Sequence, residues 1–123
     1  MNYQNKAKNF YKSKNMIKKI NQIEGAVKIY PNNTIKHETV KFQIAWKLKN
    51  MGFEVWTEAE FEKPYKGRCD VFALDRNGNF YIIEVLESET DKEFQEKIKN
   101  YPQGDFNVIS VKAKDFKEEE FKL

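Results

Sequence analysis

The stretch from residue 67 to residue 85 constrains the fold most. It contains two apolar runs joined by the turn signal Asn77-Gly78, and each run carries one carboxylate where an apolar side chain is expected. Asp70 lies near the start of the first run and Glu84 near the end of the second. Apolar runs on either side of an Asn-Gly pair are typical of a β-hairpin. A hairpin here brings the two acids together, in the geometry of a metal site.

The length of the hairpin loop decides whether the two acids share a face. A two-residue loop would place Asp70 opposite Val85, with Asp70 and Glu84 on opposite faces, whereas a loop of three or five residues places Asp70 opposite residue 86 or 84. We predict the odd loop, with Gly78 or Asn79 at a positive φ and a bulge. Both acids then share a face with Phe72, Leu74, Phe80, Ile82 and Leu86.

Both faces of this hairpin are apolar, so both need a cover. The second face carries Cys69, Val71, Ala73, Tyr81, Ile83 and Val85. Sheets that are buried on both faces occur in α/β proteins with helices on two sides. The prediction is a three-layer α/β/α sandwich around a four-stranded mixed sheet, in the order helix, strand, strand, strand, helix, strand.

Two segments have the pattern of covering helices. The first begins at Thr34 or Lys36 and ends near Met51, before Gly52. Its inward stripe at helical spacing is His37, Val40, Lys41, Ile44, Leu48 and Met51, with Glu38 on the flank. The second begins at a capping box formed by Thr90 and Glu93 and extends to about Tyr101.

Two further segments have the pattern of strands. Residues 53–61 alternate, with an acidic face of Glu54, Glu58 and Glu60 that is typical of a solvated sheet edge, although Glu58 lies where a site residue could be supplied. Residues 106–111 follow a crossover from the hairpin, which predicts a strand parallel to its second strand.

Length and charge suggest one domain with a basic arm. The 123 residues suit a single core, placed at residues 34–111. Residues 1–25 form the arm, with a weak helical pattern over 2–24, and residues 112–123 form a polar helix or tail that adds little to the core. Residues 1–50 carry eleven lysines against two glutamates, whereas residues 51–123 carry eleven basic and seventeen acidic residues. This separation suggests a polyanion held by the first part of the chain, although a solvated helix has the same composition.

The arm has the composition of a phosphate-binding segment. Its lysines interleave with Phe10 and Tyr11, which fits a phosphate contact, a solvated face or a membrane-surface helix equally. The candidates are Lys6, Lys8, Lys12, Lys14, Lys18 and Lys19. One cysteine excludes an internal disulfide, and with one histidine it excludes the usual zinc sites, so we expect an intracellular, cytoplasmic protein. No run approaches the ~20 apolar residues of a membrane span, so we expect none.

The paired acids predict a divalent cation. Two adjacent buried carboxylates repel each other and tend to stay protonated unless a cation is present. Ligands that are all oxygen favour Mg²⁺ or Mn²⁺, and the carbonyl of Val85 is a candidate third ligand. Asp70 as a turn cap and His37 as a structural histidine are the alternatives without chemistry.

This order of elements and acids resembles the restriction-endonuclease-like superfamily, named for its PD-(D/E)XK motif, over about residues 36–111. The motif's first acid corresponds to Asp70 and its second to Glu84, and a helical glutamate of some members corresponds to Glu38. His37, Lys41 and Glu58 fit the pattern of a competence-related branch. The resemblance implies a nuclease that uses Mg²⁺ or Mn²⁺.

The chain departs from the motif at its lysine, whose position is taken by Leu86. In the superfamily this lysine orients or activates the attacking water and offsets phosphate charge. Lys41 is the first candidate to replace it, because a lysine on a core-facing stripe is unusual, and Lys97 and Lys36 are the others.

The leading hypothesis is a metal-dependent deoxyribonuclease. Asp70 and Glu84 would bind the metal, Glu38 or Glu58 would support them, and the lysines of the arm with Lys36 and His37 would hold double-stranded DNA. The alternative is an inactive nuclease fold that binds nucleic acid or a protein, and a protein-interaction module is the third hypothesis. A homodimer is left open.

Overall fold

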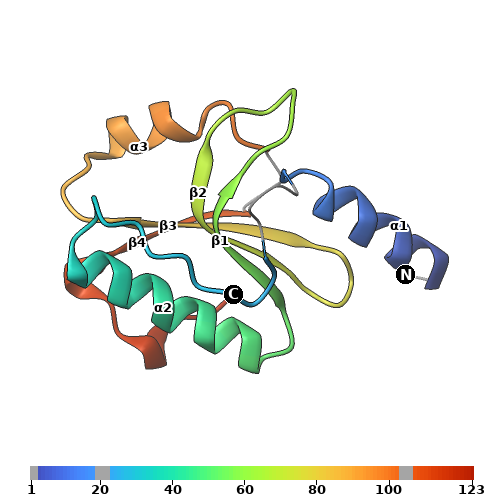
Figure 1. Ribbon diagram of the computed structural model, residues 1–123, viewed down its shortest axis with the longest axis horizontal. Coiled ribbons are helices and arrows are strands. Elements are labelled where there is room, and N and C mark those ends of the chain that lie inside the picture. The colour runs from blue at the N-terminus through green and yellow to red at the C-terminus, as the bar shows by residue number, and fades with distance from the viewer. Residues whose placement is uncertain (1–2, 19–22, 103–106) are drawn as a thin grey trace.

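The core of the molecule is one mixed sheet. A computed structural model describes residues 3–18, 23–102 and 107–123. The strands lie in the order β1 (Glu54–Glu60), β2 (Arg68–Leu74), β3 (Phe80–Leu86) and β4 (Val108–Lys112) (Figure 1). β2 runs antiparallel to both β1 and β3, whereas β4 runs parallel to β3. The predicted α/β class and four-stranded mixed sheet are therefore confirmed, including the parallel last strand.

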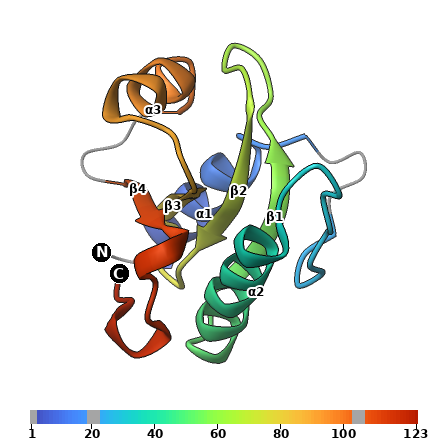
Figure 2. The ribbon, with the colours of Figure 1, turned by 90° about the vertical axis from the view of Figure 1, so that its left-hand side faces the viewer.

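Helices lie on both sides of this sheet. They are α1 (Tyr3–Lys14), α2 (Ile35–Asn50) and α3 (Asp91–Ile98). α2 and α3 lie on opposite sides of the sheet (Figure 2). Among the residues that the structure describes, no helix is long and apolar enough to cross a membrane.

Side-chain caps define where the two covering helices begin. The Thr34 hydroxyl accepts the His37 N–H at the start of α2, and Thr90 and Glu93 form the predicted capping box at the start of α3. The predicted stripe of α2 is buried as far as Leu48, but Met51 is 50% exposed. Met51 is wrong as a core residue because it is the C-cap, where the chain leaves the helical path.

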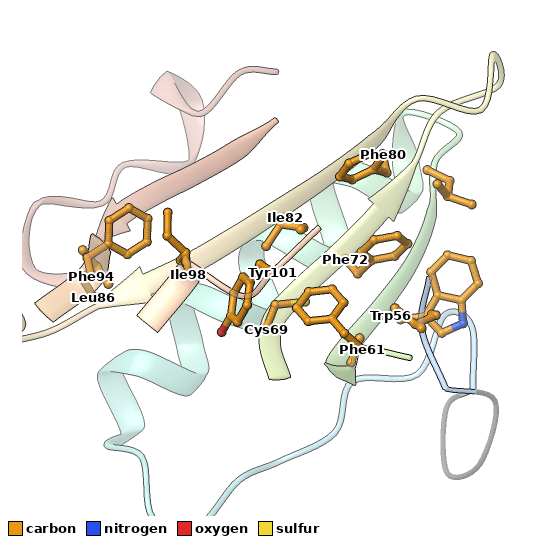
Figure 3. Close-up of a cluster of buried hydrophobic side chains, with 13 residues drawn as sticks. Trp56, Phe61, Cys69, Phe72, Phe80, Ile82, Leu86, Phe94, Ile98 and Tyr101 are labelled. Atoms are coloured by element: carbon orange, nitrogen blue, oxygen red, sulfur yellow. The ribbon is translucent and has the colours of Figure 1, made fainter. Parts of the chain in front are cut away.

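Each face of the sheet has its own hydrophobic cluster. The α3-face cluster (Figure 3) contains Ile17, Trp56, Ala59, Phe61, Cys69, Phe72, Leu74, Phe80, Ile82, Leu86, Phe94, Ile98 and Tyr101. The α2-face cluster contains Val40, Ile44, Ala45, Leu48, Val55, Val71, Ala73, Ile83, Val85, Ala113 and Phe121. Ala113 and Phe121 are buried, so the prediction that residues 112–123 add little to the core is wrong.

The β2–β3 hairpin has the odd loop that the paired acids require. Leu74 pairs with Phe80, which leaves a five-residue loop over 75–79, and Gly78 has a φ of 85°. The Asp75 carboxylate accepts the N–H groups of Asn77 and Asn79 at 2.8 and 2.9 Å and closes the loop. The predicted odd loop and the positive φ at Gly78 are confirmed, and of the two predicted lengths the structure has five residues.

α1 packs against this loop and is shorter than predicted. The Ser13 hydroxyl donates to the Gly78 carbonyl at 2.8 Å, and a Cβ at Gly78 would lie 2.5 Å from the Phe10 nitrogen. The helix ends at Lys14, and Ile17 forms a β-bridge with Phe61. The predicted helix over 2–24 is therefore wrong beyond Lys14, and its residues 19–22 lie outside the described residues.

In β1 and β2, side chains stop alternating between the two faces of the sheet at neighbouring positions, Glu58 and Asp70. Trp56 and Ala59, an odd number of residues apart, both lie in the α3-face cluster, because Glu58 between them has a φ of 50°. Glu58 is 3% exposed, so the predicted solvated acidic face is wrong at this residue. In β2, Cys69 lies in the α3-face cluster, not with Val71 as predicted.

Candidate active site

The two hairpin acids meet where β2 and β3 stop pairing regularly. The pairing runs from Leu74 opposite Phe80 to Val71 opposite Ile83, and one step further the same register places Asp70 opposite Glu84. There an Asp70 carboxylate oxygen accepts the Val85 N–H at 2.7 Å. Both side chains are buried, Asp70 at 6% and Glu84 at 0% exposure. The structure thus brings together the two residues that sequence reasoning ranked first.

The surroundings of Glu84 favour a protonated carboxyl group. Lys97 Nζ lies 3.0 Å from Glu84 Oε2, while Tyr101 Oη lies 2.9 Å from Glu84 Oε1 and 2.7 Å from the Arg68 carbonyl oxygen. A hydroxyl donates one hydrogen and a carbonyl can only accept, so both Tyr101 contacts are hydrogen bonds only if Glu84 donates in one of them. Burial and the Asp70 charge raise the pKa of Glu84 to about 8, against the opposing effect of Lys97.

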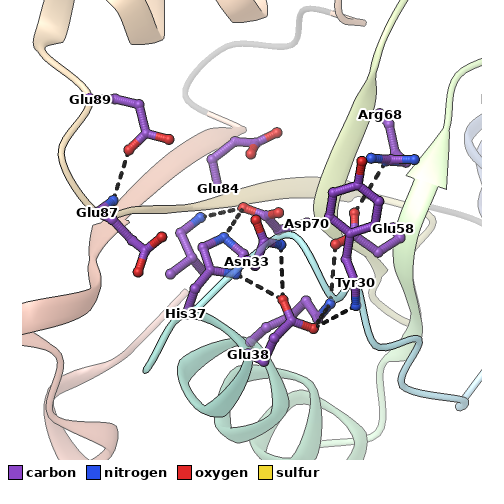
Figure 4. Close-up of polar contacts among 12 residues, drawn as sticks. Tyr30, Asn33, His37, Glu38, Glu58, Arg68, Asp70, Glu84, Glu87 and Glu89 are labelled. Carbon is purple, nitrogen blue, oxygen red and sulfur yellow. Dashed lines mark hydrogen bonds and ion pairs between the residues drawn. The ribbon is translucent and has the colours of Figure 1, made fainter. Parts of the chain in front are cut away.

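Asp70 is held in the opposite protonation state. Its carboxylate lies 3.4 Å from His37 Nε2, and His37 Nδ1 lies 3.0 Å from Glu38 Oε1 (Figure 4). Burial lowers the pKa of His37, but these two carboxylates outweigh it and raise this pKa to about 9. Burial raises the pKa of Asp70, but hydrogen bonds with His37, Glu84 and the Val85 N–H bring it below its ordinary value. At neutral pH the pair is therefore an ionised Asp70 beside a protonated Glu84.

Lys41 forms a separate ionic cluster under the first. Its fully buried ammonium donates to Glu38 Oε2 at 2.6 Å, to Glu58 Oε1 at 3.1 Å and to the Lys28 carbonyl at 2.6 Å. Arg68 Nε lies 3.3 Å from the other Glu58 oxygen. The three donors of an ammonium group match these three acceptors, so Lys41 is satisfied within the protein.

Glu38 links both clusters to the loop before α2. It accepts the Tyr30 N–H at 3.0 Å and the Asn33 side-chain amide at 2.9 Å. Burial raises the pKa of Glu38, but hydrogen bonds from Lys41, Tyr30, Asn33 and His37 lower it to about 2. Glu38 is therefore ionised at neutral pH.

The predicted nucleic-acid lysines of the arm lie elsewhere. α1 contacts the loop at 75–79, at the opposite end of the hairpin from Asp70 and Glu84. α1 ends at Lys14 and does not extend along the sheet to Asp70 and Glu84. The lysines of this helix therefore lie at the other end of the sheet from the site: Lys6, Lys8, Lys12 and Lys14. Lys18 instead lies 3.8 Å from Glu60, Lys19 lies outside the described residues, and Lys36 is exposed at the start of α2.

Three residues of the site escaped sequence reasoning. The sequence predicts Tyr101 as an inward residue at the end of the second covering helix, but α3 ends at Ile98 and Tyr101 follows it. Arg68 and Tyr30 have no periodic signal. Yet Arg68 Cζ lies 4.4 Å from the centroid of the Tyr30 ring and links it to Glu58. Nothing in the sequence signals these contacts, because each joins different segments of the chain.

The donor set fits Mg²⁺ or Mn²⁺ through two carboxylates. In the ranges that the structure describes, no group of three His, Cys, Asp or Glu side chains surrounds a metal position. Mg²⁺, however, commonly uses one or two carboxylates and keeps several waters. The Asp70 charge raises the pKa of Glu84, and a cation between the two carboxyl groups would relieve this repulsion. The carbonyl of Val85 follows Glu84 on β3. No protein-family model, curated protein or solved structure matches the chain.

Proposed function

We propose that the chain is a metal-dependent DNA nuclease of the restriction-endonuclease-like, PD-(D/E)XK type. One observation carries this proposal: Asp70 and Glu84 meet as a buried carboxyl pair at the open end of the β2–β3 hairpin. The mixed sheet with helices on both sides supports it, since the motif's acids in this superfamily occupy neighbouring strands. When bound, Mg²⁺ or Mn²⁺ supplies charge neutralisation for phosphate oxygens and activation of water.

The surrounding residues have distinct roles in this proposal. Asp70 and Glu84 hold the cation, with the Val85 carbonyl as a further ligand. His37 keeps Asp70 ionised and oriented through a contact of 3.4 Å. Tyr101 fixes the rotamer of Glu84 through a contact of 2.9 Å. Residues that orient the ligands in this way strengthen a metal site without touching the metal.

Lys97 is a better replacement for the motif lysine than Lys41. Lys97 reaches Glu84 from α3 and its side chain is 43% exposed, so its ammonium can also reach a phosphate. Lys41 is 0% exposed and its donors are used by Glu38, Glu58 and Lys28. A cation that must offset charge on a substrate needs access to it, which Lys41 lacks.

A second candidate is a nuclease-like fold that binds nucleic acid without cutting it. Two observations favour it: Leu86 occupies the motif position of the lysine, and each site carboxylate already has a basic partner. Asp70 pairs with His37, Glu84 with Lys97, and Glu58 with both Lys41 and Arg68. Such a site needs no metal for its stability, so the absence of Mg²⁺-dependent or Mn²⁺-dependent thermal stabilisation would favour this candidate.

Cleavage of plasmid and linear duplex DNA tests the proposal. We expect purified protein to degrade both with Mg²⁺ or Mn²⁺ and to stop when the metal is chelated. Glu84→Gln should abolish cleavage because the uncharged amide is a poor ligand for a divalent cation. Glu96→Gln is the matched control, since Glu96 is an exposed α3 residue paired with Lys99. Undiminished cleavage by Glu84→Gln would show that the activity does not come from this site.

A further inference from the structure

A groove beside the site combines basic side chains with a fixed backbone. The connection between β1 and β2, residues 61–67, lies at the same end of the sheet as Asp70 and borders a groove of about 530 Å³. Lys18, Lys63 and Lys66 line it together with Glu60 and Tyr65. We call it the loop groove.

Hydrogen bonds hold the loop in place from three sides. The Phe61 N–H donates to the Gly67 carbonyl at 2.9 Å and closes the loop on itself. The Glu62 N–H donates to the Met16 carbonyl at 2.7 Å, and the Lys66 N–H donates to the Asn100 carbonyl at 2.9 Å. The lysines of the loop groove therefore project from a backbone that binding does not have to order.

The charges of the loop groove are only partly neutralised. Among the described residues, carboxylates form ion pairs with Lys18 and Arg68, through Glu60 and Glu58, but with neither Lys63 nor Lys66. Lys63 and Lys66 are both exposed. Two unneutralised cations on a fixed loop are suited to hold an anion with regularly spaced charges.

Tyr101 lies between the loop groove and the site and contacts both. Gly67 packs so closely on Tyr101 that a Cβ would lie 2.5 Å from its ring, and Tyr101 in turn contacts Glu84. From Lys66 to Asp70 the chain advances four residues, which span at most about 13 Å at about 3.3 Å per residue. This length corresponds to about four nucleotides at about 3.4 Å each along one strand of a duplex.

From these charges and from the contact of Tyr101 with both Gly67 and Glu84, we propose that the loop groove binds the sugar-phosphate backbone of the DNA substrate, with Lys63 and Lys66 in contact with its phosphates. The inference rests on the proposed nuclease function and gives the substrate's path to the site. It differs from the sequence-based expectation that the lysines of the arm hold the DNA together with Lys36 and His37. Of the predicted lysines that the structure describes, only Lys18 lines the loop groove.

DNA binding without metal tests this path separately from catalysis. A short fluorescein-labelled duplex is titrated with protein at several salt concentrations and followed by fluorescence anisotropy. In the variant Lys63→Ala/Lys66→Ala, the slope of log Kd against log salt should fall by about 1.8, because each lost phosphate contact removes about 0.9. Lys8→Ala/Lys12→Ala is the matched control: it removes the same charge from exposed positions on α1 and should leave the slope unchanged. Circular dichroism of both variants checks that they are folded.

The outcomes separate the path from the nuclease proposal. Three results would contradict the proposal that the loop groove binds DNA. These are a Kd and salt slope unchanged in Lys63→Ala/Lys66→Ala, an equal loss of salt slope in Lys8→Ala/Lys12→Ala, and no DNA binding by native protein. Binding that depends on Lys63 and Lys66 supports it, even if the bound DNA is never cut when Mg²⁺ or Mn²⁺ is added. In that last case the nuclease proposal fails and the binding path stands.

Discussion

Two ionic clusters lie side by side beneath the start of α2, and they differ in how completely their charges are satisfied. In one, Lys41 balances Glu38 and Glu58 with all three of its donors in use and no exposure. In the other, Asp70 and Glu84 lie together, and burial and the Asp70 charge raise the pKa of Glu84 although Lys97 contacts it. A buried ion pair with every donor used is a structural element, whereas a carboxyl pair that retains a proton is suited to bind a cation.

Removing the charge of Lys41 should have the largest effect on stability. Lys41→Met keeps the volume of the side chain but leaves Glu38 and Glu58 without their shared buried partner. Breaking a buried pair from one side costs about 3–5 kcal/mol of unfolding free energy. Urea unfolding of the variant measures this loss. Lys36→Met is the control, because the side chain of Lys36 is exposed and its replacement should change stability by less than about 0.5 kcal/mol. Equal stability of both variants would remove the distinction between the clusters.

His37 connects the two clusters and should make stability depend on pH. Its pKa is raised to about 9 in the folded protein, so its contribution is fully present below the unfolded pKa of about 6.5 and is lost as the pH rises through about 9. Native protein should therefore exceed His37→Gln in unfolding free energy by roughly 3 kcal/mol near pH 6, and the difference should vanish near pH 10. Urea unfolding across this range tests the sign. A difference that grows with pH would contradict a cationic His37.

Glu84→Gln should leave stability almost unchanged while removing the response to metal. At neutral pH the Glu84 carboxyl is already protonated, so an amide of similar shape should alter the unfolding free energy by no more than about 1 kcal/mol. Native protein at a hundred times the Kd for Mg²⁺ should gain about 2.7 kcal/mol, and the variant should gain none. Thermal unfolding with and without Mg²⁺ measures both effects. A variant that Mg²⁺ still stabilises would place the cation away from the hairpin.

Much of the fold was predictable because its signals are local. The caps at Thr34 and Thr90 and the apolar stripe of α2 involve residues within one or two helical turns of one another. The odd length of the hairpin loop followed from a parity argument, since only an odd length lets Asp70 and Glu84 share a face. The tail was misjudged because its apolar residues are too sparse to form a pattern, although Phe121 is buried.

The candidate site was predictable in its acids and not in its bases. Asp70 and Glu84 interrupt apolar runs, and such interruptions are visible in a sequence because burial of an unpaired carboxylate is costly. Which lysine faces them depends on how α3 crosses the sheet, and Lys97 reaches Glu84 only for that reason. Arg68 and Tyr101 likewise acquire their contacts from segments far away in the chain.

The sequence by itself determined the helix and strand periods, the turn at Gly78 and the odd length of the hairpin loop, because each depends on spacing along one short segment. The tertiary structure alone decided that Glu58 turns into the protein at a φ of 50°, that Lys41 is satisfied, and that α1 docks on the hairpin loop. These features depend on contacts between segments that are far apart in the sequence, and a local sequence pattern does not predict such contacts.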